Sequence, residues 1–300
     1  IARYWIESLA RVPVTCEVAS EFHYRQPATA PYNTAIAISQ SGESLDTLMA
    51  MRHAASCGLQ TIGLVNVPSS TIAREADAVL PTRAGPEIGV ASTKAFTAQL
   101  TVLLCFAVAL ARAKGQIDDA RAEAIHAEIQ ALPGLVGKAL GLFDAIRPVA
   151  HQLSQARSAL YLGRGALYPL AMEGALKLKE LSYIHAEGFA SGEMKHGPIA
   201  LIEENLPIVA LLAADAVMAK ASSNLREASA RGGKIILLSE ARAAAEVDYA
   251  SAVITVPDVD PLLAPILLAI PAQILAYLTA VEKGTDVDQP RNLAKSVTVE

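Results

Sequence analysis

Short apolar runs alternate with longer segments of helical periodicity along most of the chain. The runs are rich in Ile, Val, Leu and Ala and end at polar or glycine-containing segments, as strands of a buried parallel sheet do. The predicted strands are 34–39, 60–66, 78–81, 158–162, 208–213, 234–239 and 253–256. The predicted helices are 46–57, 70–76, 93–114, 170–183, 216–231 and 264–281. This alternation predicts an α/β protein with parallel sheets flanked by helices.

The pattern occurs twice. Segments 17–22 and 187–194 share the letters Ala-Ser and a preceding glutamate, and each follows a predicted helix. In the second half a strand and the loop at 161–165 come before that helix, whereas no counterpart stands before residue 1. We therefore expect a first repeat that lacks its opening strand; two unrelated α/β units in tandem are the alternative. The predicted domains are 1–137 and 138–283, followed by a tail, 284–300.

The stretch 261–281 carries no charged residue, and its 21 residues are long enough to cross a membrane. Three prolines and Gln273 interrupt it, and no Lys or Arg flank precedes it. These features favour a buried helix of a soluble protein, so no membrane partner is expected.

Charge and cysteine content narrow the function classes. The net charge is −5 and no block of Lys and Arg exists, which excludes a basic surface for nucleic acid. The three cysteines, Cys16, Cys57 and Cys105, have neither disulfide-framework nor zinc spacing, which suits a reducing cytoplasm. The first residues do not form a signal peptide. An anionic ligand would have to be held by local donors.

The loop Ser39-Gln40-Ser41-Gly42-Glu43-Ser44 lies between a predicted strand and a predicted helix. Ligands of open α/β sheets bind at this edge, and the helix start offers free N–H groups and a positive dipole end. Hydroxyl groups, an amide and a glycine there could enclose the phosphate of a sugar phosphate. A capping box of the following helix is an equally good interpretation. The glycines at 163 and 165 lack the third glycine of a dinucleotide fingerprint, so no cofactor is expected.

Four segments taken together resemble one enzyme family. They are 39–44, 87–96, 173–180 with 193–198, and 286–300. They are similar to the C-terminal isomerase half of glucosamine-6-phosphate synthases. The resemblance implies two tandem sugar isomerase (SIS) domains, each a five-stranded parallel sheet flanked by helices in a flavodoxin-like three-layer sandwich. It also implies binding of fructose 6-phosphate, glucose 6-phosphate or glucosamine 6-phosphate, and isomerisation of the ketose to a 2-amino aldose.

The same resemblance assigns proton transfer to Glu180, with Lys177 supporting it. On a helix, Glu173, Lys177 and Glu180 fall on one face at i, i+4 and i+7. Without the resemblance, a solvated face with charge pairing is the commoner meaning of this spacing.

His196 is the implied ring-opening acid and base, contributed by the neighbouring subunit of a homodimer. Lys295 is the implied imine former, whose amine must be neutral to attack a ketone, and Arg291 could lower its pKa. By residue type alone, a loop histidine is more often a surface group, and a lysine near a chain end is usually exposed.

The implied substrate contacts are Ser39, Gln40, Ser41, Ser44, Val90, Ser92 and Ala294. No cluster of residues has metal-ligand spacing, and none is expected to bind a metal. The family's glutaminase domain is expected to be absent from this chain. A non-catalytic SIS module that binds sugar phosphates is the alternative function, and a plain phosphosugar isomerase is a further one.

Overall fold

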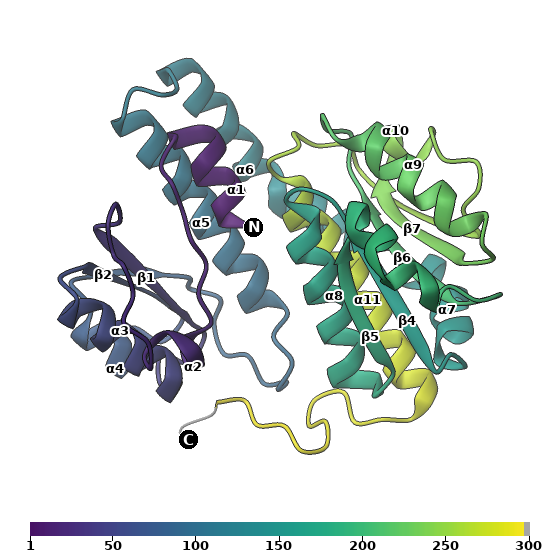
Figure 1. Cartoon of the computed structure of the whole chain (residues 1–300), viewed down its shortest axis with the longest axis horizontal. Coiled ribbons are helices and arrows are strands. Elements are labelled where there is room, and N and C mark those ends of the chain that lie inside the picture. Colours follow the sequence, from purple (N-terminus) through teal and green to yellow (C-terminus); the bar gives the residue numbers. More distant parts are fainter. Residues whose placement is uncertain (297–300) are drawn as a thin grey trace. The chain divides into compact units, whose positions relative to one another are not determined.

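The computed structural model describes residues 1–296, which form two compact units, each with its own sheet (Figure 1). The N-terminal unit comprises residues 2–122 and the tail from Asn292, and the C-terminal unit comprises residues 123–291 with residue 1. Both are α/β units with parallel sheets, which confirms the predicted fold class. The domain limits expected from the sequence, 137/138 and 283/284, remain a prediction.

The N-terminal unit has a parallel sheet in the order β1-β2-β3, formed by Thr34–Ser39, Gln60–Val65 and Ala78–Pro81. Its helices are α1 (Ala2–Trp5), α2 (Ala19–Phe22), α3 (Leu45–Ser56), α4 (Thr71–Glu75) and α5 (Lys94–Ala113), and a π-helix covers Ile6–Ala10. A small apolar core joins α3 and α4 to β2 through Leu48, Met51, Val65 and Ile72. The sheet thus fixes β1 so that its carboxyl end opens onto the loop at 39–44.

Within the described residues this sheet has three strands instead of the five that the resemblance implied. The repeat pattern explains the difference. In the other sheet, the edge strand β5 (His185–Ala190) pairs with β4 (Ser158–Gly163), its one neighbour in the sheet order. The first repeat has no described counterpart of β4, so residues 17–22 have no partner strand and lie in extended chain and α2.

The C-terminal unit has a parallel sheet in the order β5-β4-β6-β7-β8. Strands β6 (Pro207–Leu212), β7 (Lys234–Glu240) and β8 (Ala252–Val256) are the later ones, and the first two are buried along almost their whole length. Its helices are α6 (Asp119–Leu140, whose first turn falls in the N-terminal unit), α7 (Phe143–Ser154), α8 (Leu167–Ser182), α9 (Met218–Ser229), α10 (Ala241–Ala244) and α11 (Ala264–Lys283). Two 3₁₀ helices, η2 (Ser191–His196) and η3 (Pro198–Leu201), follow β5. Because β4 precedes both of its neighbours in sequence, the topological switch point lies beside it.

Helix α11 contains the uncharged stretch noted in the sequence. Helices α5 and α11 are both long and apolar enough to cross a membrane by length and composition, and a third candidate arises if the bent pair α6 and α7 is one span. In α11, 83% of the most apolar window is buried within the protein, where the helix packs against α7 and α8. The prediction of a buried helix is therefore confirmed for this stretch.

Candidate functional site

The loop after β1 is closed by hydrogen bonds among its own serines. Ser39 Oγ accepts the N–H of Gly42 at 3.0 Å and lies 3.2 Å from Ser44 Oγ. Ser41 Oγ accepts the N–H of Glu43 at 3.1 Å. Gly42 has a φ of +68°, and a Cβ there would lie 2.0 Å from Ser70 Oγ, so glycine is required on both counts. The loop thus gathers three hydroxyl groups where β1 ends.

The capping interpretation of this loop is wrong in its details. Ser44 is the N-cap of α3, but its side chain makes no capping hydrogen bond. The Glu43 carboxylate accepts the N–H of Thr71 at 2.8 Å, and this hydrogen bond is the main reason why the pKa of Glu43 is lowered. Since neither side chain caps α3, the first N–H groups of that helix are left for a ligand.

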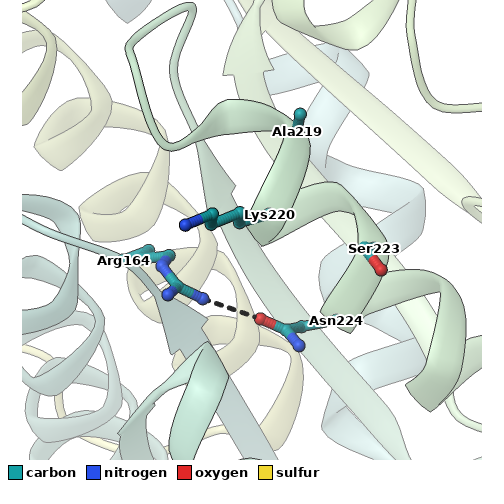
Figure 2. A pocket seen from close by; sticks show the side chains of 5 residues that line it. All are labelled: Arg164, Ala219, Lys220, Ser223 and Asn224. Carbon is teal, nitrogen blue, oxygen red and sulfur yellow. Dashed lines mark hydrogen bonds between the residues drawn. The ribbon is translucent and has the colours of Figure 1, made fainter.

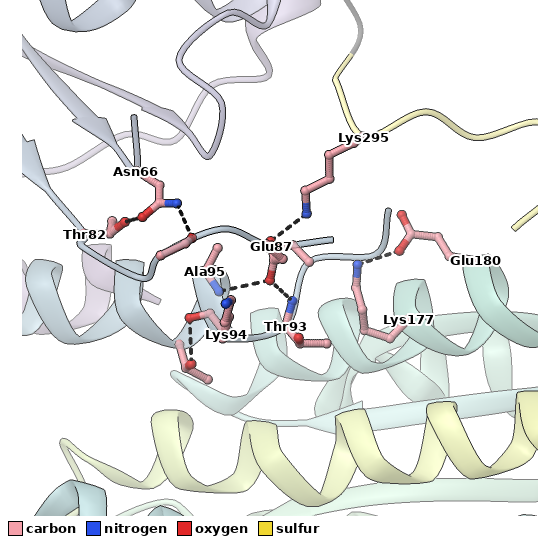
Figure 3. Close-up of polar contacts among 12 residues, drawn as sticks. Asn66, Thr82, Glu87, Thr93, Lys94, Ala95, Lys177, Glu180 and Lys295 are labelled. Carbon is pink, nitrogen blue, oxygen red and sulfur yellow. Dashed lines mark hydrogen bonds and ion pairs between the residues drawn. The ribbon is translucent and has the colours of Figure 1, made fainter. Parts of the chain in front are cut away.

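The tail docks onto the N-terminal unit at two points. Lys295 Nζ lies 2.6 Å from Glu87 Oε2 (Figure 3), and Ser296 Oγ lies 3.1 Å from Ser41 Oγ. The side chain of Lys295 is 25% exposed and that of Glu87 is 4% exposed. The segment that carries the predicted imine former is therefore held beside the serine loop, as a docked tail requires.

Glu87 is the centre of this contact, and the sequence analysis assigned it no role. Its carboxylate also accepts the N–H of Thr93 at 2.9 Å, the N–H of Ala95 at 3.2 Å and the hydroxyl of Ser92 at 3.0 Å. Burial alone would raise the pKa of Glu87, but the hydrogen bonds from Lys295, Thr93 and Ala95 outweigh burial and hold it below its usual value. Glu87 thus places a charge at the start of α5, where a helix favours an anion.

The loop that bears Glu87 is fixed by Asn66, which follows β2. Asn66 Nδ2 donates to the carbonyl of Gly85 at 2.8 Å, and its Oδ1 accepts the N–H of Ala84 at 2.8 Å and the hydroxyl of Thr82 at 3.0 Å (Figure 3). Two signals in the sequence pointed to Glu87: it is an acidic residue shortly before a predicted helix, and it opens segment 87–96, one of the four that carry the family resemblance.

The remaining expected substrate contacts lie in the same unit. Gln40 follows β1, and its carbonyl accepts the N–H of Asn66 at 3.1 Å. Val90 lies half-buried in the loop before α5, and Ala294 is exposed beside Lys295. The Ser92 hydroxyl donates its hydrogen bond to Glu87. A ligand would therefore bind Ser92 by donating a hydrogen bond to its Oγ, or by replacing Glu87 as the acceptor.

In the C-terminal unit, α8 brings together the three charged residues that the spacing predicted. Lys177 Nζ lies 2.5 Å from Glu180 Oε2 (Figure 3) and 3.5 Å from Glu173 Oε1. The side chains are 5%, 22% and 17% exposed, respectively. The shared helix face is confirmed, while the alternative of a solvated face is wrong, because the cation is buried between two carboxylates.

The electrostatics of this cluster single out Glu173. Burial raises its pKa to about 7; the charge of Lys177 opposes this rise and the charge of Glu180 adds to it. A single ammonium group cannot fully offset the desolvation and mutual repulsion of two buried ionised carboxylates. A carboxyl group that titrates near neutral pH can give or take a proton under physiological conditions.

The other two predicted groups of the C-terminal unit are differently placed. His196 is exposed at the end of η2, where a ligand or another chain can reach it. The guanidinium of Arg291 lies over the ring of Tyr183, 4.2 Å from its centroid, and the backbone N–H of Arg291 donates to the Tyr183 hydroxyl at 2.9 Å. The charged partner of Lys295 is a carboxylate rather than an arginine.

Within residues 1–296, no group of three His, Cys, Asp or Glu side chains could hold a metal ion. A polar pocket, lined in part by Arg164 and Lys220, lies at the carboxyl edge of the C-terminal sheet.

Comparison with known proteins places these observations in a family. The SIS domain family matches residues 1–109 and 152–283. Glutamine–fructose-6-phosphate aminotransferases (isomerizing) of Zymomonas mobilis and Bradyrhizobium diazoefficiens are 56% and 54% identical over this whole chain. The chain spans about half the length, 50%, of these curated relatives.

Solved structures give the same result. The C-terminal domain of glucosamine-fructose-6-phosphate aminotransferase from Francisella tularensis is 43% identical, with a TM-score of 0.93 over 96% of this chain and 82% of that one. Glucosamine-6-phosphate deaminase from Thermotoga maritima, 21% identical with a TM-score of 0.79 over 98% of this chain and 85% of that one, shares the fold. The chain therefore belongs to the SIS domain family, and within it to the family of C-terminal domains of glucosamine-fructose-6-phosphate aminotransferases.

Proposed function

We propose that this chain is the isomerase part of a glutamine–fructose-6-phosphate aminotransferase. It would bind fructose 6-phosphate and convert it, with ammonia, into glucosamine 6-phosphate and water. The observation that carries the proposal is the docking of Lys295 on Glu87 together with that of Ser296 on Ser41, beside the loop that begins at Ser39. A module that only bound sugar phosphates would need the serine loop but no buried contact for a lysine amine.

The phosphate group would be held by the loop after β1. Ser39, Ser41 and Ser44 supply hydroxyl groups, and the uncapped start of α3 supplies N–H groups and a positive dipole end. Gln40, Val90, Ser92 and Ala294 would contact the sugar. Hydroxyl and N–H donors suit a phosphate dianion, and they need no lysine block of the kind that the acidic composition excludes.

Lys295 would form the imine. Its neutral amine attacks the C2 carbonyl carbon of the open-chain ketose, and the carbonyl oxygen leaves as water. The ammonium must first leave Glu87 and give up its proton, because the protonated amine has no lone pair. Ammonia then displaces the lysine from C2, and a proton moves from C1 to C2 to give the 2-amino aldose.

Glu180 would move the proton between C1 and C2. Lys177, 2.5 Å from it, keeps its carboxylate in one orientation and would also support substrate oxygens. Proton transfer needs a group that exchanges its proton near the working pH. The cluster provides one in Glu173, which shares Lys177 with Glu180.

His196 would open the sugar ring and would come from the neighbouring subunit of a homodimer. Mixing two inactive variants tests this sharing. Glu180→Gln and His196→Asn homodimers should each have little activity, whereas their mixture should recover up to about a quarter of the wild-type value, because mixed dimers contain one intact site. If the activity of the mixture stays at that of the separate variants, both groups act within one chain.

We further propose that ammonia reaches this chain from a glutaminase domain in the whole protein, which acts in the cytoplasm. The proposal rests on the curated relatives, which are about twice the length of this chain and are named glutamine–fructose-6-phosphate aminotransferases. No resident cofactor or metal is needed, since the imine supplies the electron sink for proton transfer.

Reduction of the imine tests the reaction directly. Borohydride in the presence of fructose 6-phosphate should fix the sugar as a secondary amine on Lys295, which peptide mass mapping locates. Lys295→Arg should abolish the label, and Lys283→Arg, a matched change at the end of α11, should leave it unchanged. Label elsewhere, or sugar-phosphate binding without label and without exchange of the C1 proton into solvent, would identify a non-catalytic module instead.

A further inference from the structure

A polar pocket lies in the C-terminal unit, at the carboxyl edge of its sheet. Arg164, Ala219, Lys220, Ser223 and Asn224 line it, and its volume is 360 Å³ (Figure 2). Arg164 directly follows β4, and the other four lie within the first seven residues of α9, which follows β6. Since β4 and β6 are neighbours that meet at the switch point, this is the place where open α/β sheets bind ligands.

The charges that line this pocket are positive. Figure 2 shows the guanidinium of Arg164 and the ammonium of Lys220 among the five side chains that line it. Neither cation forms an ion pair with any group in residues 1–296. Two like charges at one small opening repel each other, and an anion between them would remove that repulsion.

Nearby carboxylates are engaged elsewhere. Glu227, further along α9, lies 2.8 Å from Lys195 Nζ. Asp215, in the loop after β6, accepts the N–H of Val217 at 2.9 Å, and burial raises its pKa. The Asp215 carboxylate therefore occupies a backbone N–H of the loop after β6, so this N–H is not available to a phosphate. The residues that line the pocket include two cations and no carboxylate, so an anion there would meet the side-chain cations directly.

The pocket is also partly preorganised. Arg164 Nη1 donates to Asn224 Oδ1 at 3.0 Å, and Asn224 is buried. This bond holds one edge of the guanidinium and leaves its other donors for a ligand. Ser223 adds a hydroxyl group. An arginine fork, an ammonium and a hydroxyl together match the oxygens of a phosphate group.

We propose that this pocket is a second anion site, which binds a phosphate monoester of a small metabolite. Its volume lies within the range of small-molecule pockets, and it is formed by none of the residues of the first serine loop. The site does not depend on the reaction proposed for Lys295, and a failure of either proposal leaves the other in place.

Calorimetric titration of the whole chain with inorganic phosphate and with glucose 6-phosphate tests the site. A background variant, Ser39→Ala with Ser41→Ala, disables the serine loop after β1. Further substitutions in this background then show which residues hold any anion that still binds. Adding Arg164→Gln with Lys220→Gln should weaken the surviving binding at least tenfold. Adding Arg157→Gln with Lys234→Gln removes the same charge at the amino ends of β4 and β7 and should change affinity less than twofold.

A third change keeps the test decisive if loss of Arg164 disturbs folding. Ala219→Glu places a carboxylate in the pocket from an exposed helical position that tolerates glutamate, and it should abolish the surviving binding. Tighter binding of glucose 6-phosphate than of phosphate supports a phosphosugar, and equal binding supports free phosphate. No surviving binding once the first loop is disabled, or equal losses in the Arg164 and Arg157 variants, would overturn the proposal.

Discussion

Glu87 is the residue whose removal should affect both stability and tail docking. Its carboxylate is 4% exposed and accepts from four donors: Lys295, Ser92 and the backbone N–H groups of Thr93 and Ala95. A hydrogen bond to a charged group contributes about 1.5 to 3 kcal/mol, and a buried donor without a partner costs about 1 to 3 kcal/mol. Because water can enter and the terms overlap, we expect Glu87→Ala to lower the free energy of unfolding by about 3 kcal/mol.

The assay can be confined to the N-terminal unit. Trp5 is the single tryptophan of the chain, and it is buried in this unit, where α1 contacts α5. Urea unfolding followed by Trp5 fluorescence therefore reports on the helix that Glu87 caps. Glu21→Ala, which removes an exposed carboxylate from the same unit, should change the free energy by less than about 0.5 kcal/mol.

A double-mutant cycle separates docking from capping. Lys295→Met removes one donor whose side chain is 25% exposed and should cost about 1 kcal/mol, less than Glu87→Ala. The two changes together should cost less than their sum by about 1 kcal/mol, because they share one contact. Strict additivity, or a Glu87→Ala loss no larger than that of Glu21→Ala, would refute the reasoning.

Acid should act on the same contact. The pKa of Glu87 in the folded protein is held below its ordinary value of 4.5, so its contribution to stability is fully present above pH 4.5. The contribution is lost as the pH falls through the lower folded-state value. Glu87→Gln should therefore reduce the acid sensitivity of the Trp5 transition, and an unchanged slope below pH 4.5 would contradict this assignment.

Two further predictions concern single positions. The pKa of Glu173 is raised to about 7, so the folded protein holds its proton more tightly than the unfolded chain does, and stability should fall as the pH rises from about 4.5 to 7. Thermal unfolding of Glu173→Gln should lack this fall. Gly42→Ala places a Cβ 2.0 Å from Ser70 Oγ and should lower the free energy of unfolding by about 2 to 4 kcal/mol, as urea unfolding would measure. It should also weaken sugar-phosphate binding, as calorimetric titration would measure. Gly58→Ala, with a similar φ of +83° and nothing within 4 Å, should cost about 1 kcal/mol and leave affinity unchanged.

Local patterns predicted most of the elements, because each strand and helix is specified by its own residues. The prediction for 78–81 matches β3 at both ends, and that for 34–39 matches β1. Strand β5 was missed because His-Ala-Glu-Gly-Phe-Ala has no β-branched residue. Its extended form comes from pairing with β4, which is a tertiary effect.

The candidate site also has features that local sequence patterns predict and features that depend on tertiary packing. The positions of Glu173, Lys177 and Glu180 on one helix face follow from helical spacing, and the ion pairs confirm it. Their burial does not follow, since it depends on what packs against α8. Glu87 could not be found from spacing, because its partner Lys295 lies 208 residues further along the chain.

The docking of Lys295 and its proposed chemistry require opposite charge states. A carboxylate with a lowered pKa binds an ammonium well and accepts a proton poorly, so the contact with Glu87 places the lysine and suits an ammonium group. Imine formation requires the amine without its proton. The contact that locates the nucleophile must therefore break before the reaction, and Ser41, which contacts Ser296 in the same tail, belongs to the loop proposed to bind the substrate phosphate. A phosphate that engages Ser41 would compete with that second contact, so substrate binding itself would help to release the tail lysine.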